Sequence, residues 1–152
     1  MVTIEEGRHS EASRIAWFMG LPGWAEMNDV RLVRKVETGL PISAADKIIR
    51  RIDPGGDYLH VHDIVPRATY YRRKEQGKPL SRDLSEKILA LSKVFQETLR
   101  HYHGDTKTAV TFLLREHPML GGRSPLDMAK ESTAGADLVL KLLARAEAGV
   151  AA

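Results

Sequence analysis

One stretch, residues 81–103, carries the most regular spacing of apolar side chains in the chain. The spacing alternates between four and three residues, which places these positions along one side of a single long helix. The positions are Leu84, Ile88, Leu91, Phe95, Thr98 or Leu99, and Tyr102. Ser81 or Asp83 is expected to cap the start of this helix, and Gly104 to end it. Such a helix predicts a central core element, with a dimer surface as the alternative.

Helical signals also precede the long helix, and no stretch alternates apolar and polar residues as a strand does. Residues 11–19 and 28–38 have helical spacing, and Asn28 or Asp29 is expected to cap the second of these helices. The side chains of the second helix that we expect to point inward are Val30, Val33 and Val36. The order Ser43-Ala44-Ala45-Asp46 has the spacing of a capping box, which predicts a helix that begins there and reaches Ile52. We therefore predict an all-α fold.

Residues 58–64 and 67–76 have the pattern of two short helices separated by Val65-Pro66, with Gly77 ending the second. This is the layout of a helix-turn-helix, whose second helix enters the major groove of DNA. That second helix is the most basic run of the chain, and Arg and Lys can contact bases and phosphates. The candidate DNA-binding residues are Arg67, Thr69, Tyr70, Arg72, Arg73, Lys74 and Lys78. A solvated basic helix that contacts nothing is the alternative.

The sequence near the C-terminus is marked by strong helix-boundary signals. Gly121-Gly122 breaks the preceding helix, and Ser124, Pro125 and Asp127 then occupy the N-cap, first and third positions of a new helix. Gly135 is expected to interrupt it, and a last helix should run over 136–148 and end at Gly149. Its inward positions are expected to be Val139, Leu140, Leu143 and Ala146. A compact helical unit of this kind more often binds another surface than catalyses a reaction.

Composition restricts the possible chemistry. The chain of 152 residues has no cysteine, so disulfides, thiolate zinc sites and thiol nucleophiles are excluded. The two His-x-His pairs, at residues 60–62 and 101–103, are poor chelates, because on a helix their rings point about 200° apart. We therefore expect no metal, no cofactor and no catalytic residue. A net charge of +3 mildly favours an acidic partner, and the lack of a signal or membrane segment predicts a cytoplasmic protein with no membrane partner.

The order of these C-terminal signals resembles a known family. The residues that carry the resemblance are Pro118, Leu120-Gly121-Gly122-Arg123-Ser124-Pro125-Leu126-Asp127, Gly135, Val139, Leu143 and Gly149. They are similar to the toxin-binding domain of the Xre/MbcA/ParS antitoxins, with Phe112 where that family often has Trp. The basic helix also resembles the helix-turn-helix of these antitoxins, where a Thr precedes a pair of Arg and a Gly follows.

The resemblance implies a function for each half of the chain. The partner would be a RES-domain toxin that consumes NAD, inhibited when the C-terminal domain covers its active site. The residues expected nearest the toxin are Gly122, Arg123, Arg145, Gly149, Val150, Ala151 and Ala152. By the same resemblance Arg67, Thr69, Tyr70 and Arg73 would lie nearest operator DNA, with Tyr71 packed inward. Arg73→Ala should then weaken binding to the preferred site by about 1–3 kcal/mol more than binding to random DNA.

We expect three parts: a helical N-terminal extension over 1–40, an Xre-like helix-turn-helix region with the long connecting helix over 41–103, and a toxin-binding domain over 104–152. In the extension, Trp17 and Trp24 are expected to anchor on the main body. Helix-turn-helix proteins usually bind palindromic DNA sites as two-fold symmetric dimers, so we also expect a homodimer. A stand-alone helix-turn-helix regulator with a C-terminal protein-interaction domain remains the alternative function. An enzyme is the third and least favoured interpretation.

Overall fold

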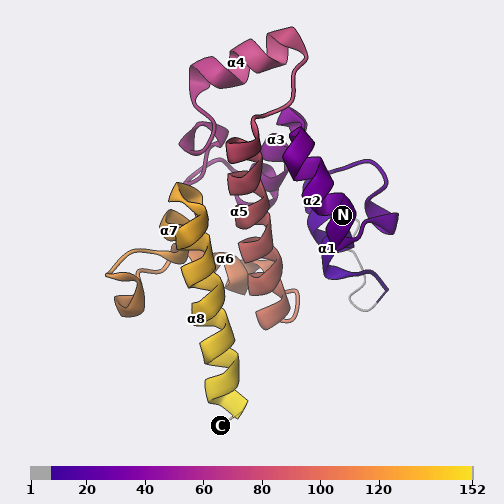
Figure 1. Ribbon diagram of the computed structural model, residues 1–152. Helices are drawn as coiled ribbons and strands as arrows, with labels where there is room; N and C mark the ends of the chain where they lie inside the picture. Colours follow the sequence, from indigo (N-terminus) through magenta and orange to yellow (C-terminus); the bar gives the residue numbers. More distant parts are fainter. Residues whose placement is uncertain (1–7, 152) are drawn as a thin grey trace. The chain divides into compact units, whose positions relative to one another are not determined.

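The computed structural model describes the chain over residues 8–151, with side chains through residue 149, and this part is helical throughout (Figure 1). The α-helices are α1 Glu11–Phe18, α2 Asp29–Thr38, α3 Ile42–Ile52, α4 Arg67–Gln76, α5 Arg82–His101, α6 Thr106–Leu114, α7 Pro125–Glu131 and α8 Thr133–Ala151. Three short 3-10 helices lie between them: η1 Trp24–Glu26, η2 Val61–Asp63 and η3 Pro118–Leu120. The predicted all-α class is confirmed, and the long predicted helix is α5.

The chain packs as two compact units that divide inside α5, between Ser92 and Lys93. The first unit contains α1 to α4 and the first half of α5, and the second contains the rest of α5 with α6, α7 and α8. The boundaries after residues 40 and 103 that we expected from the sequence stay a prediction about domains.

Helix α2 begins as expected, because the Asn28 side chain accepts a hydrogen bond from the Arg31 amide. Its inward face, however, differs from the prediction. Val36 is buried, but Val30 and Val33 are exposed, and Leu32 takes the second inward position. Leu32 and Val36 lie four residues apart and so share one side of the helix, whereas Val33 lies about 100° away from Leu32. Leucine also buries more apolar surface than valine, which favours this rotation.

The predicted capping box at the start of α3 is wrong. The helix begins at Ile42, one residue before Ser43, and no side chain caps it. Pro41 is held in an extended conformation, and its carbonyl accepts the Ala44 amide, so the backbone enters the helix directly after the proline. The inward face of α3 is nevertheless the expected one, with Ile48, Ile49 and Ile52 buried.

The N-terminal extension is joined to α3 through Arg51. The Arg51 guanidinium carbon lies 3.8 Å from the centre of the Trp17 ring, and Arg51 Nε donates to the Phe18 carbonyl oxygen at 3.1 Å. Trp24 contacts His9 edge-to-face with the ring centres 5.0 Å apart. Trp17 therefore anchors α1 on the first unit as expected, while Trp24 closes the extension on itself.

A close backbone approach fixes the loop that leaves α4. The Leu80 amide donates to the Leu40 carbonyl at 2.9 Å, and the Leu40 amide donates to Ser85 Oγ at 2.8 Å. Gly39 precedes this contact with φ of 105°, and a Cβ there would lie 2.4 Å from the Leu80 carbonyl oxygen. Only glycine fits this position. The far end of α4 is thus attached to the turn between α2 and α3.

In the second unit, α7 begins as the sequence predicts. Ser124 Oγ accepts the Asp127 amide at 3.1 Å, and Pro125 is the first helical residue. The chain breaks at Ser132, and α8 then starts at Thr133, so Gly135 lies in the first turn of α8 and does not separate the helices.

Gly135 allows α7 and α8 to pack closely, because a Cβ there would lie 2.0 Å from the Met128 carbonyl oxygen. The predicted end of the last helix is wrong, since Gly149 is helical and α8 continues to Ala151. Glycine lowers helix propensity but leaves the backbone bonds intact, so it does not force an end. Leu142 is buried and Ala146 is exposed, in contrast to the predicted face.

Candidate functional site

The segment before α4 is not the α-helix that we predicted over residues 58–64. Only the 3-10 turn η2 forms there. The buried Asp53 carboxylate accepts the amides of Tyr58 and Leu59 at 2.8 and 2.9 Å, which holds this backbone in a turn. Burial alone would raise the pKa of Asp53, but these backbone hydrogen bonds outweigh it and lower the pKa below the ordinary value.

The two tyrosines of α4 point in the opposite sense to the prediction. Tyr70 is buried, and its hydroxyl donates to Asp46 Oδ2 on α3 at 2.8 Å. Tyr71 is 52% exposed. A single tyrosine can reach α3 from this part of α4, and Tyr70 is the one that finds a hydrogen-bond acceptor there. Tyr70 therefore seats the helix, and its assignment as a DNA contact is corrected.

Arg73 is directed to the end of its own helix. Its Nη1 donates to the Pro79 carbonyl oxygen at 2.8 Å, in the loop that follows Gly77. The Gly77 backbone is left-handed, as expected at a helix end, and turns the chain back within reach of Arg73. This bond occupies the guanidinium that we had expected to read a base.

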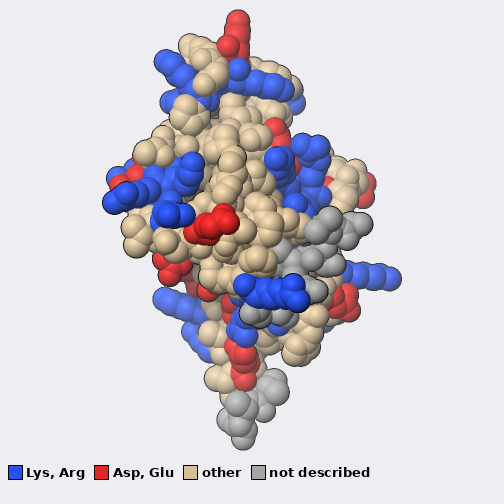
Figure 2. Space-filling model, turned by 90° about the vertical axis from the view of Figure 1, so that its right-hand side faces the viewer, with Lys and Arg blue, Asp and Glu red and all other residues tan. Residues whose placement is uncertain are grey.

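The face of α4 opposite Tyr70 carries Ala68, Arg72 and Glu75, with Tyr71 at its side. Figure 2 shows Lys and Arg side chains gathered at the top of the view, where Figure 1 draws α4. The exposed cations of α4 and its exit loop are Arg67, Arg72, Lys74 and Lys78, whereas Thr69 is half-buried. This surface, which we call the α4 face, has the charge and shape to lie against a polyanion.

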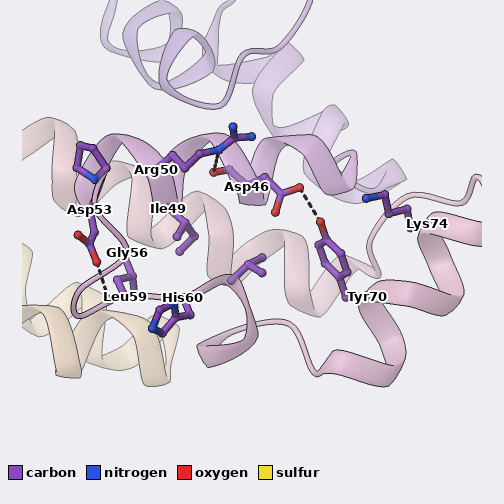
Figure 3. Close-up of a pocket in the computed structure, with 12 residues that line it drawn as sticks. Asp46, Ile49, Arg50, Asp53, Gly56, Leu59, His60, Tyr70 and Lys74 are labelled. Atoms are coloured by element: carbon purple, nitrogen blue, oxygen red, sulfur yellow. Dashed lines mark hydrogen bonds between the residues drawn. The ribbon is translucent and has the colours of Figure 1, made fainter.

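A cleft of about 510 Å³ lies between α3, the loop after it and α4 (Figure 3). Its two carboxylates are already bonded, Asp46 to the Tyr70 hydroxyl and Asp53 to backbone amides. In Figure 3 the Arg50 side chain runs along α3 toward Asp46, and its Nε donates to the Asp46 carbonyl oxygen. The hydrogen bond between Tyr70 and Asp46 thus joins α4 to α3 across this cleft.

The candidate toxin-binding residues fall in two places of the second unit. Gly122 and Arg123 belong to the loop over 117–123, where the Arg123 carbonyl oxygen accepts the His117 amide at 3.0 Å. Arg123 also forms an ion pair with Glu131 at 2.7 Å. These two residues therefore shape the loop.

The remaining candidates lie at the end of α8. Arg145 and Gly149 are exposed in its last turns, residues 150 and 151 continue the helix, and Ala152 lies outside the described residues. Arg100 Nη2 binds Glu147 Oε2 at 2.8 Å and also pairs with Glu97, which links these turns to the end of α5. Past the buried Leu143, the helix extends beyond the other helices of its unit (Figure 1).

Sequence reasoning missed three exposed apolar side chains of the second unit. They are Leu114, Met119 and Leu138, and Met119 is 54% exposed in η3. Each lies directly beside a buried apolar residue, Leu113, Leu120 or Val139, so no spacing rule separates it from the core. Exposed apolar groups on a small domain mark candidate protein-contact positions.

Two family models match the chain over most of its length. Residues 31–93 match the antitoxin Xre-like helix-turn-helix domain, and residues 98–149 match the C-terminal toxin-binding domain of the Xre/MbcA/ParS antitoxins. The chain belongs to the Xre/MbcA/ParS antitoxin family. A search of curated proteins found no match. In this antitoxin, α4 lies in the helix-turn-helix domain, and the 117–123 loop and α8 lie in the toxin-binding domain.

Both matched domains of the antitoxin are binding domains. In the part of the chain that the structure describes, no helix is long and apolar enough to cross a membrane. Nor does any cluster of three or more His, Cys, Asp or Glu side chains among those residues offer a metal site.

Proposed function

We propose that this antitoxin inhibits a RES-domain toxin that consumes NAD, and that it represses its own operon by binding operator DNA through the α4 face. The proposal that the chain inhibits a toxin rests on the exposed end of α8, which lies within a matched toxin-binding domain. Residues 144–149 are all exposed, and Arg145 brings a cation to this end. The Arg145 cation on this narrow helix end suits a cleft that binds an anionic dinucleotide, because its charge opposes the partial negative charge of a helix C-terminus.

The DNA half of the proposal is supported by the α4 face. Four exposed cations lie on α4 and its exit loop, and hydrogen bonds to α3 and to the loop after Gly77 hold this helix in place. A homodimer would present two such helices to a palindromic site with half-sites about one helical turn apart. We propose this dimer as the DNA-binding form.

The first experiment is a pull-down of the tagged antitoxin from its native host, with identification of the bound proteins. We expect one small protein in near-stoichiometric amount that depletes NAD when it is expressed alone. Recovery of DNA without a protein partner would instead favour a stand-alone regulator.

The second experiment measures NAD consumption by the purified toxin. Deletion of residues 150–152 should reduce protection and leave the complex intact, and Arg145→Ala should act in the same direction. Lys141→Ala is the matched control, because Lys141 is exposed on α8 one turn earlier. Full protection by the truncated chain would exclude the end of α8 as the inhibitory element.

A further inference from the structure

Tyr71 stands out among the exposed side chains of the first unit. It leaves 52% of its surface in solvent, although the adjacent Tyr70 is buried. Its flanking residue Arg72 is an exposed cation, and Arg67 lies one helical turn earlier on α4. About half of this large aromatic ring is thus available, beside two cations, to a partner outside the described chain.

The Tyr71 ring is held in place before any partner arrives. It meets the Tyr70 ring edge-to-face with the centres 5.2 Å apart, and it lies 6.0 Å from the His62 ring. His62 is fixed in turn, because its Nδ1 lies 3.1 Å from the Val65 carbonyl oxygen and its ring also packs against Tyr70. Immobilising an aromatic group in advance lowers the entropy cost of binding.

We propose that Tyr71 is a specificity-determining residue, and that its ring packs on the C5-methyl group of a thymine in the operator. This inference rests on the proposed function, in which α4 enters the major groove. The thymine methyl is the apolar group that the major groove presents, and it distinguishes T·A from the other base pairs. With Arg67 and Arg72 available for phosphate or guanine, the ring between them faces the floor of the groove.

A second kind of contact is open to tyrosine, because its hydroxyl can donate to a phosphate oxygen. Within the described part of the chain the Tyr71 hydroxyl forms no hydrogen bond, unlike the Tyr70 hydroxyl. The two contacts differ in what they require. Methyl recognition requires the ring and the thymine methyl, whereas a phosphate contact requires the hydroxyl and is indifferent to the base.

The test begins by selecting the preferred site from a pool of random duplexes with the full-length antitoxin. Each thymine of a half-site is then replaced by uracil, which removes only the methyl group, and Kd is measured at fixed salt. We expect one position per half-site at which uracil weakens binding about fourfold. Tyr71→Phe should keep this discrimination, and Tyr71→Ala should bind the two sites equally.

Val33→Ala is the matched control, since Val33 is a half-exposed apolar residue on α2, and it should keep the discrimination. A uracil effect that persists in Tyr71→Ala would overturn the inference, as would a loss in Tyr71→Phe that is equal on thymine and uracil. Absence of any preferred DNA site would instead remove the proposed function and the inference with it. Circular dichroism of Tyr71→Ala checks that the variant is folded.

Discussion

The Tyr70 hydroxyl donates a 2.8 Å hydrogen bond to Asp46 Oδ2, and this bond joins α4 to α3. Burial, followed by this hydrogen bond, raises the pKa of Tyr70 to about 12. The bond determines which side of α4 faces outward, because the residues opposite Tyr70 on the helix must then point to solvent. The α4 face therefore depends on one buried tyrosine.

Tyr70→Phe should destabilise the first unit by about 1 kcal/mol, because it removes one hydrogen bond and keeps the ring packing. Chemical denaturation monitored by circular dichroism measures this change. Tyr71→Phe is the control, and its stability should match that of the parent chain. An equal loss of stability in both variants would mean that the hydrogen bond to Asp46 does not stabilise the first unit.

Tyr70→Phe should also change how the stability of the protein depends on pH in the alkaline range. In the folded protein the pKa of Tyr70 is raised from 10.0 to about 12. The protonated hydroxyl therefore contributes fully to the free energy of unfolding below pH 10, and this contribution is lost as the pH rises through 12. Tyr70→Phe should lack this loss. Absorbance titration should show a phenol ionisation near pH 12 in the parent that is missing from the titration curve of the variant.

Arg72→Ala should weaken binding to the preferred DNA site by about 1–3 kcal/mol more than binding to random DNA, if Arg72 reads a guanine. Arg73→Ala should have a smaller effect on this difference, because its guanidinium is bonded to the Pro79 carbonyl. Binding titrations on both kinds of DNA distinguish the two arginines. If Arg73→Ala lost more of the difference in affinity between preferred and random DNA than Arg72→Ala, Arg73 would be the residue that reads the base.

Gly135→Ala should destabilise the second unit by about 1–3 kcal/mol, because the new methyl group would overlap the Met128 carbonyl oxygen and backbone cannot move aside cheaply. Gly149→Ala is the matched control in the same helix, where nothing lies within 4 Å of the added atom. That variant should be neutral or slightly more stable, since alanine favours the helix. Thermal unfolding of the two variants gives the comparison.

Glu147→Gln should leave global stability almost unchanged, because the pair with Arg100 lies at the surface and is screened by solvent. It should loosen the last turns of α8, since no residue after Leu143 is buried through Gly149. Hydrogen exchange of the amides of residues 144–149 should accelerate, while exchange in α7 stays the same. Unchanged exchange at the end of α8 would show that Arg100 does not hold it.

Some features of this antitoxin follow from the sequence alone, because they depend on neighbours along the chain. Ser124, Pro125 and Gly77 each act within one turn of a helix, and all three were placed correctly. Asn28 was one of two expected caps of α2, and it is the one that forms. Local hydrogen bonds and backbone preferences are short-range, so the residue types suffice to predict them. The all-α class and the two family resemblances also follow from such local order.

Other features required the tertiary structure. Nothing within α4 distinguishes Tyr70 from Tyr71, and the choice depends on Asp46, which lies 24 residues earlier. The same holds for Arg73, whose acceptor exists only because the chain returns after Gly77. Gly149 remains helical because no neighbouring segment meets α8 at this position. Gly135 is required because the backbone of α7 lies directly against it. Local sequence determines a helix start that its own side chain caps, as at α7, whereas contacts between distant residues decide which side of each helix is left for a partner.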